Sequence, residues 1–343
     1  MTTIALTGGG TAGHVMPSIA LLNELYKFSD RIIFIGGNGI EKQIADEYAL
    51  PFYSTQVVKF DRSHFLNNFK IPFVMKSAVE EAKEILKSEN VDAVFAKGGY
   101  CSLPASLASH ALDIPLIIHE SDYTMGLANK ILSRYASRVL TAFPETSGGE
   151  YVGAPIRDEI FKGNATRARE KYNLSPNKKT LLVFGGSQGA LAINDLIFPI
   201  VNNLTKTMNV VHVVGKNEKR KIVSENYVSL PYASDIADLY AISDVIVMRA
   251  GASSLAETSA LGKRVIAIPL PKGTSRGDQV LNAESYKKHS LIDVIKQEEA
   301  TPMLLFEHVE KMLLLPEKSK NRISTNARIA EIIAEEIAKK RRF

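Results

Sequence analysis

Three glycines near the N-terminus have the spacing of a phosphate-binding turn. Gly8, Gly10 and Gly13 form the pattern G-x-G-x-x-G between an apolar run and a helix-like stretch. Glycine lets the backbone turn tightly, and a helix N-terminus favours negative charge. A nicotinamide site also needs an acidic residue at the end of the second strand. Here that strand-like run ends in glycines, and its first acid, Glu41, lies beyond them. The pattern therefore argues against a nicotinamide site.

A second group of small residues lies in the C-terminal half. The turn GASS at 251–254 follows the apolar run DVIVM, and its N–H and hydroxyl groups suit a diphosphate. Glu257 lies about one turn further along, within reach of ribose hydroxyls. A glycine turn at 185–190 ends another apolar run, and both turns should lie at the carboxyl edge of one sheet. This predicts a nucleotide site, although simple helix capping by the first turn stays open.

Apolar runs alternate with helix-like segments and must position these turns. Continuous apolar strands separated by helices predict a parallel sheet covered on both faces. The openings IALTGGGTAGH and LLVFGGSQGA look like two copies of one unit, with a polar stretch at 157–179 between them. We therefore expect two doubly wound domains joined near 155–160, and a closing helix at the C-terminus. The strand-like runs are 4–7, 31–36, 93–99, 115–120 and 138–143, then 180–186, 209–215, 244–251 and 264–270.

Composition narrows the class of protein. The 343 residues allow two domains, and 45% hydrophobic residues suit a globular chain with sizeable cores. No apolar run reaches the roughly 18 residues of a membrane span, and no secretory signal is expected. The single cysteine, Cys101, excludes an internal disulfide and a cysteine-cluster metal site, and favours the cytoplasm. The net charge of +5 suits an anionic substrate or membrane surface, and no nucleic-acid signature is present.

Eight motifs occur in a fixed order along nearly the whole chain. They are GGGTAGHVMPSIALLNEL, KGGY, IPLIIHESD, GLANK, VGAPIR, GGSQGA, RAGASSLAE and SRGDQVLNA. Together they resemble the MurG family of peptidoglycan N-acetylglucosaminyltransferases. The resemblance implies an inverting transfer of N-acetylglucosamine from UDP-N-acetylglucosamine to the 4-hydroxyl of the muramoyl sugar of lipid I, which forms lipid II. It also implies the GT-B fold, with two Rossmann-like domains facing a cleft. The expected domains are 1–157 together with a helix at 323–343, and 158–322.

The resemblance implies a donor site built mainly from the second domain. The GGSQ and GASSLA turns would hold the diphosphate and uracil side, and Glu257 would bind the ribose. Gln279, beside Asp278, would contact the sugar hydroxyls. The implied donor-binding residues are Thr11, Ala12, Gly13, Asp122, Arg157, Ser187, Ala233, Arg249, Gly251, Ala252, Ser253, Ser254, Leu255, Ala256, Glu257 and Gln279.

The acceptor and the catalytic base are assigned to the first domain. The loop 8–13 would hold the diphosphate of the acceptor, and His14 would lie near its hydroxyl. A near-neutral pKa suits His14 as a general base, although it could instead only hold the loop by a hydrogen bond. Glu120, Asp122 and His119 remain alternative bases. The implied acceptor-lining residues are Gly9, Gly10, Lys97, Gly98, Gly99, Tyr100 and His119.

Two positions depart from the family pattern. Many members have HEQN where this chain has HESD, so Asp122 replaces an asparagine that contacts the donor sugar. A carboxylate cannot donate amide hydrogen bonds, but it can accept one or act as a base. Ala12 stands where glycine is common. No D-x-D motif lies at a strand end, so we expect no cofactor and no metal requirement, while stimulation by magnesium stays open. The helix start at 251–254 would stabilise the leaving group.

Aromatic and basic residues alternate in KFDRSHFLNNFKIPFVMK at 59–76. This composition suits an interface with anionic lipid, although ordinary core packing stays open. The polyprenyl-linked acceptor of the family favours the membrane interpretation, and places the protein peripherally on the cytoplasmic face of the membrane. The expected membrane-contacting residues are Phe69, Ile71, Phe73 and Met75.

Other functions remain compatible with these patterns. A UDP-sugar transferase for another lipid acceptor, or a UDP-N-acetylglucosamine 2-epimerase, would share the donor site. An oxidoreductase would use the first glycine loop, which lacks its acid. A non-catalytic binding module would bind ligands without turnover.

Overall fold

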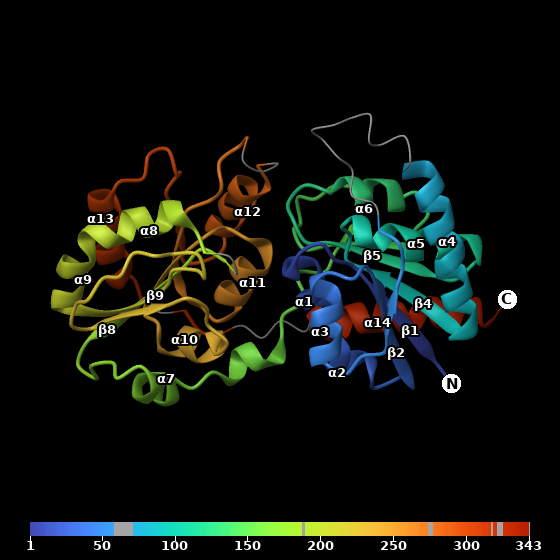
Figure 1. Ribbon diagram of the computed structural model, residues 1–343, viewed down its shortest axis with the longest axis horizontal. Helices are drawn as coiled ribbons and strands as arrows, with labels where there is room; N and C mark the ends of the chain where they lie inside the picture. Colours follow the sequence, from blue (N-terminus) through green and yellow to red (C-terminus); the bar gives the residue numbers. More distant parts are fainter. Residues whose placement is uncertain (58–70, 187–188, 274–276, 317, 321–324, 343) are drawn as a thin grey trace. The chain divides into compact units, whose positions relative to one another are not determined.

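The computed structural model describes residues 1–57, 71–186, 189–273, 277–316, 318–320 and 325–342 (Figure 1). The chain divides into two compact units. The first comprises Met1–Arg157 and Ser324–Phe343, and the second comprises Asp158–Ile323. Ser187 and Phe69, both expected site residues, lie outside the described part of the chain.

The first unit contains a seven-stranded sheet in the order β3-β2-β1-β4-β5-β6-β7, and every strand pair in it is parallel. The chain order reverses at β1, so the loops after β1 and β4 lie side by side. The strands are β1 (Thr3–Thr7), β2 (Arg31–Gly36), β3 (Phe52–Ser54), β4 (Val91–Ala96), β5 (Leu116–Glu120), β6 (Arg138–Thr141) and β7 (Glu150–Tyr151). The helices are α1 (Ala12–Ile19), α2 (Leu22–Leu25), α3 (Ile40–Glu47), α4 (Ile71–Ser88), η2 (Tyr100–Ser102), α5 (Leu103–Ala111), α6 (Leu127–Leu132) and α14 (Thr325–Lys340).

Strand β1 shows why the runs are apolar on both faces. All five of its residues are buried. Ile4 and Leu6 join a core that includes Ile333 of α14, whereas Ala5 joins the opposite core with Ala105 of α5. Alternate side chains of a strand point to opposite faces, so helices must cover both. The expectation of parallel sheets covered on two faces is confirmed.

The closing helix α14 belongs to the first unit, where it lies among elements from the N-terminal half of the chain (Figure 1). Asn326 anchors its first turn. The side-chain amide of Asn326 donates to the carbonyls of Ala20 (3.0 Å) and Ile156 (2.7 Å), and its oxygen accepts the Ile156 N–H at 3.1 Å. The apolar face of α14 fills the core beside β1 and β4.

The second unit repeats the arrangement with six parallel strands, in the order β10-β9-β8-β11-β12-β13. Its order reverses at β8, so the loops after β8 and β11 are neighbours. The strands are β8 (Lys179–Phe184), β9 (Met208–Val213), β10 (Tyr227–Leu230), β11 (Val245–Met248), β12 (Arg264–Ala267) and β13 (Ile292–Val294). The helices are η3 (Asp158–Lys162), α7 (Ala165–Lys171), α8 (Leu191–Ile197), η4 (Phe198–Ile200), α9 (Val201–Thr207), α10 (Ile236–Ile242), α11 (Ala252–Ala260), α12 (Asp278–Lys287) and α13 (Pro302–Leu313).

Both units thus have the strand order of a doubly wound nucleotide-binding fold, in which ligands bind where the order reverses. The described helices include none that is both long and apolar enough to cross a membrane.

Candidate functional site

The reversal point of the first unit brings two glycine loops into contact. A Cβ added to Gly99 would lie 2.6 Å from the carbonyl oxygen of Gly9, so the two backbones leave no room for a side chain. Gly10, Gly98 and Gly99 have positive φ angles of 83°, 80° and 77°, a region that other residues rarely adopt. The structure therefore brings together the loops after β1 and β4, which carry residues expected on the acceptor side.

His14 lies in the first turn of α1, beside the residue that precedes the helix. Its Nδ1 is 2.9 Å from the Thr11 hydroxyl oxygen, and its backbone N–H donates to the Thr11 carbonyl at 3.1 Å. The His14 side chain is half-buried, and Thr11 is exposed. The hydrogen bond required by the loop-holding interpretation of His14 is therefore present, and the ring also lies near the surface, where a base must lie.

Lys97 and His119 meet inside the first unit rather than at its surface. Lys97 is 1% exposed and His119 is 0% exposed. His119 Nε2 lies 2.8 Å from the Gly153 carbonyl, which can only accept, so Nε2 donates. Nδ1 is then an acceptor, and Lys97 Nζ donates to it at 2.5 Å and to the Ser121 hydroxyl at 2.6 Å.

Burial controls the charge of this pair. Desolvation lowers the pKa of Lys97 to about 7, against the opposing pull of Glu120 and Asp122. Desolvation, together with the Lys97 ammonium, holds the pKa of His119 well below its usual value. His119 is therefore a neutral imidazole with both nitrogens engaged.

Glu120 organises the loop that follows β5. Its Oε1 accepts the Asp122 N–H at 3.0 Å. Its Oε2 accepts the Gly126 N–H and the Asn129 amide, each at 2.9 Å. Glu120 is 5% exposed, whereas Asp122 and Tyr100 are half-buried. Of the two expected acids, Asp122 therefore lies nearer the surface. Asn129 and Ser121 are not predicted from the sequence, because nothing in their spacing links them to these side chains.

The start of α11 forms the corresponding region of the second unit. Gly251 precedes the helix, and a Cβ added there would meet nothing within 4 Å. Ser253, Ser254 and Glu257 are half-buried, whereas Ala252, Leu255 and Ala256 are buried in the unit. Only the first three can offer side chains to a ligand at the surface, and the buried residues can contribute only their backbone.

Glu257 has a buried partner that the sequence does not predict. The Tyr240 hydroxyl, from α10, donates to Glu257 Oε2 at 3.3 Å. Tyr240 is 1% exposed, and its ring packs at 6.0 Å between centroids against Phe184, the last residue of β8. The acid expected to bind ribose is therefore oriented by a rigid aromatic side chain.

Arg249 and Gln279 both hold the loop that follows β12. Arg249 donates to the carbonyls of Ile268 (3.0 Å) and Pro269 (3.3 Å) and to Gln297 Oε1 (2.7 Å). It is 8% exposed, and burial lowers its pKa. Gln279 accepts the Leu270 N–H through Oε1 at 3.0 Å, so its amide nitrogen is the end that can donate to a ligand.

The remaining expected residues are scattered by comparison. Ala233 is half-buried on the segment before α10, and Arg157 is half-buried at the end of the first unit. Asp278 is buried at the start of α12. The described residues contain no cluster of three or more His, Cys, Asp or Glu side chains that could hold a metal ion.

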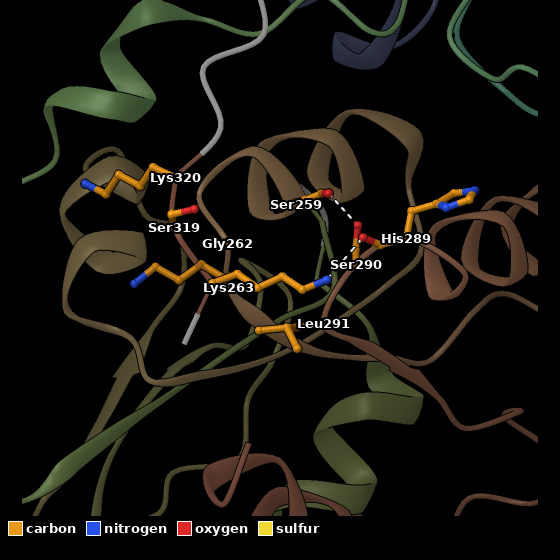
Figure 2. A pocket seen from close by; sticks show the side chains of 9 residues that line it. Ser259, Gly262, Lys263, His289, Ser290, Leu291, Ser319 and Lys320 are labelled. Atoms are coloured by element: carbon orange, nitrogen blue, oxygen red, sulfur yellow. Dashed lines mark hydrogen bonds between the residues drawn. The ribbon is translucent and has the colours of Figure 1, made fainter. Parts of the chain in front are cut away.

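A cavity of about 340 Å³ lies elsewhere in the second unit (Figure 2). Its lining residues include Gly262 and Lys263, just before β12, and Ser290 and Leu291, just before β13. It therefore lies at the amino ends of the strands, opposite the turns after β8 and β11. Two of its hydroxyl groups bind each other: the side-chain oxygens of Ser259 and Ser290 are 2.5 Å apart. This cavity is separate from the predicted nucleotide site.

Comparison with known proteins agrees with this architecture. Residues 4–141 match the glycosyltransferase family 28 N-terminal domain, and residues 180–339 match its C-terminal domain. The chain is 38% identical, over 96% of its length and 94% of the relative, to a UDP-N-acetylglucosamine--N-acetylmuramyl-(pentapeptide) pyrophosphoryl-undecaprenol N-acetylglucosamine transferase of Clostridium perfringens. A protein of the same name from Lachnospira eligens is 40% identical, over 91% of each chain.

Solved structures confirm the GT-B fold. MurG of Acinetobacter baumannii superposes with a TM-score of 0.76 at 24% identity, over 98% of this chain and 100% of that one. The UDP-GlcNAc 2-epimerase of Neisseria meningitidis has a TM-score of 0.62 at 14% identity, over 99% and 100% of the two chains. The fold alone therefore does not separate a transferase from an epimerase.

Proposed function

Because this chain belongs to glycosyltransferase family 28, we propose that it transfers N-acetylglucosamine from UDP-N-acetylglucosamine to the muramoyl sugar of undecaprenyl-diphospho-muramoyl pentapeptide. One observation carries this conclusion. Relatives that bear this activity in their names are 38% and 40% identical over 96% and 91% of the chain. A match over 96% or 91% of the chain includes residues of both units. The epimerase, by contrast, shares only the fold.

We assign the donor nucleotide to the second unit. The turn 251–254 at the start of α11 presents backbone N–H groups and two serine hydroxyls, which suit a diphosphate. Glu257, held by Tyr240, accepts hydrogen bonds from the ribose. The side-chain amide N–H of Gln279 donates a hydrogen bond to the sugar, and Arg249 holds the neighbouring loop without contacting the ligand. The other expected donor residues keep their roles as part of this proposal, including Ser187.

His14 is the general base in this proposal. The acceptor oxygen attacks the anomeric carbon while its proton passes to His14, and the bond from that carbon to the diphosphate breaks, with its electron pair leaving on UDP. Two alternatives have less support. His119 is fully buried with both nitrogens engaged, and Glu120 uses both oxygens within its own loop. Asp122 remains the second candidate because it is half-buried.

In this proposal, the helix start at 251–254 stabilises the negative charge that develops on UDP, and no metal is required for this. We therefore expect transfer to persist in EDTA, with magnesium acting only as a stimulant. This part of the proposal is tested directly by the rate with and without the chelator.

Peripheral membrane binding completes the proposal. Phe73, in the first turn of α4, is 79% exposed. Ile71 and Met75 are half-buried beside it, and Lys76 is exposed. An exposed aromatic residue beside a lysine suits an anionic lipid surface. The acceptor's undecaprenyl chain would remain in the bilayer, so we place the protein on the cytoplasmic face.

The decisive experiment incubates the purified protein with UDP-N-acetylglucosamine and a lipid I analogue, and measures UDP release and the disaccharide product. We expect product, and we expect Glu257→Ala to abolish most of it. Glu284→Ala, an exposed acid on α12 of the same unit, is the matched control. An epimerised sugar formed without acceptor would support the epimerase. Binding of a reduced nicotinamide would support an oxidoreductase. Intact donor binding without any turnover would support a binding module.

A further inference from the structure

Glu41 is a buried carboxylate that links two loops of the first unit. It lies in the first turn of α3 and is 2% exposed. Its Oε2 accepts the Gly10 N–H at 3.3 Å, and its Oε1 accepts the Gly37 N–H at 3.1 Å. Gly10 belongs to the loop after β1, and Gly37 directly follows β2. One side chain therefore holds the main chain after two neighbouring strands.

Glycines enclose this carboxylate closely. A Cβ added to Gly9 would lie 2.7 Å from Glu41 Cδ, and one on Gly37 would lie 2.9 Å from Oε1. A Cβ on Gly36 would lie 3.1 Å from Cγ, and one on Gly39 would lie 3.1 Å from Oε2. The glycines that end β2 therefore make room for Glu41.

The surroundings of Glu41 resemble an anion-binding site in which the protein's own carboxylate takes the place of an external anion. Backbone N–H groups of a glycine loop normally bind a phosphate, and here two such groups bind a carboxylate. The Cys101 thiol lies in the same region, where burial and Glu41 raise its pKa to about 12, so this neighbour stays neutral. An external diphosphate could take the Gly10 N–H only by displacing a buried negative charge.

We infer that Glu41 is a positioning residue of the acceptor half-site, the internal anion that fixes the first glycine loop. By holding Gly10, it sets the start of α1, where Thr11 and His14 contact each other. Because Glu41 occupies the Gly10 N–H, that group is not offered to a nucleotide diphosphate, and the diphosphate of the donor is left to the second unit. The inference rests on the proposed function, because it places the acceptor at this loop. It assigns the Gly10 N–H to Glu41 rather than to the acceptor diphosphate.

Glu41→Gln tests the inference, because it keeps the size of the side chain but turns one oxygen into a donor that must face an N–H group. We expect kcat/KM for a lipid I analogue to fall about 10-fold or more, since small misplacements near the reacting groups are costly. We expect KM for UDP-N-acetylglucosamine to stay within about twofold, because the nucleotide of the donor is assigned to the second unit. Amide hydrogen exchange in residues 8–13 should accelerate.

Glu47→Gln is the matched control, because Glu47 is an exposed acid on the same helix. An acceptor kcat/KM within twofold of the parent in folded Glu41→Gln would overturn the inference, and so would an equal loss of donor affinity. If Glu41→Gln does not fold, Gly39→Ala crowds Oε2 while keeping the charge, and an unchanged acceptor kcat/KM there would overturn it equally. Transfer by the unmodified protein is measured first. If the unmodified protein gives no transfer, the proposed function is contradicted. The comparison of hydrogen exchange between the parent and Glu41→Gln then still tests whether Glu41 holds the loop.

Discussion

Lys97 Nζ donates a hydrogen bond to His119 Nδ1 across 2.5 Å, between the carboxyl ends of the neighbouring strands β4 and β5. Both side chains are almost wholly buried. The amine also reaches Ser121, and the ring reaches the Gly153 carbonyl. Lys97 and His119 could each bind a substrate chemically, but here they hold the loops that follow β4 and β5. In the proposed function they would therefore influence the acceptor through the backbone.

The buried amine predicts a pH dependence of stability. The pKa of Lys97 is 10.5 in the unfolded chain and about 7 in the folded one, so between these values only the unfolded chain holds the proton. The free energy of unfolding should therefore increase as the pH is raised from about 7 to 10.5, by at most about 1.4 kcal/mol per pH unit. We expect urea unfolding of Lys97→Met to show a smaller rise than the parent.

Lys87→Met, at an exposed lysine on α4, is the control for this slope and should behave as the parent does. Equal slopes for Lys97→Met and the parent would contradict the prediction, because other titrating groups are common to both proteins.

The contact between the two glycine loops predicts a difference between two glycine substitutions. Gly99 and Gly148 both have positive φ angles, of 77° and 87°, so alanine is strained at each. Gly99 also has a ψ of 160°, a combination that essentially only glycine adopts and that costs other residues about 1–3 kcal/mol. Only at Gly99 would the Cβ also meet a backbone atom, at 2.6 Å from the Gly9 carbonyl oxygen; at Gly148 it meets nothing within 4 Å. We expect Gly99→Ala to lower the free energy of unfolding by at least about 2 kcal/mol more than Gly148→Ala. Similar denaturation midpoints for the two variants would show that the loops can separate at little cost.

Much of this architecture follows from the pattern of apolar runs. The long strands β1, β2, β8 and β9 are continuous apolar runs, without alternating polar residues, because both faces of each sheet are covered. The short strands β3 and β7, at the edges of the first sheet, were not predicted. They contain only three and two residues, too few for any periodicity to appear.

The site was predictable in its loops but not in its partners. Glycine turns after strands mark the reversal points, because the backbone must turn where neighbouring loops meet. The roles of Glu41 and Tyr240 depend on contacts across 31 and 17 positions of the chain, which no local pattern records. The same holds for Lys97, whose burial follows from the packing of β4 beside β5.

The bond from Tyr240 to Glu257 predicts a specific effect on the donor. Tyr240→Phe removes one hydroxyl from a buried ring and leaves Glu257 Oε2 without that donor. We expect KM for UDP-N-acetylglucosamine to rise about 2- to 10-fold, from the loss of one modest hydrogen bond, with KM for the acceptor unchanged. Steady-state kinetics with each substrate varied in turn measure both. Tyr227→Phe, which loses a bond to His212 in the same unit, is the control. An unchanged donor KM would mean that Glu257 is held without Tyr240.

The exposed aromatic residue at the start of α4 predicts membrane binding through the first unit. Phe73 is 79% exposed, so replacing it with serine removes little packing within the protein, and the fold should survive. Sedimentation with anionic vesicles should show Phe73→Ser binding about 3- to 10-fold more weakly than the parent, and Phe69→Ser with Phe73→Ser more weakly still, because each aromatic ring inserted at the interface adds favourable transfer energy. Leu314→Ser is the control, because Leu314 is 86% exposed but follows α13 in the second unit. If all of these variants bound vesicles as the parent does, α4 would not be the contact, and the membrane assignment would have to rest on the acceptor's lipid chain alone.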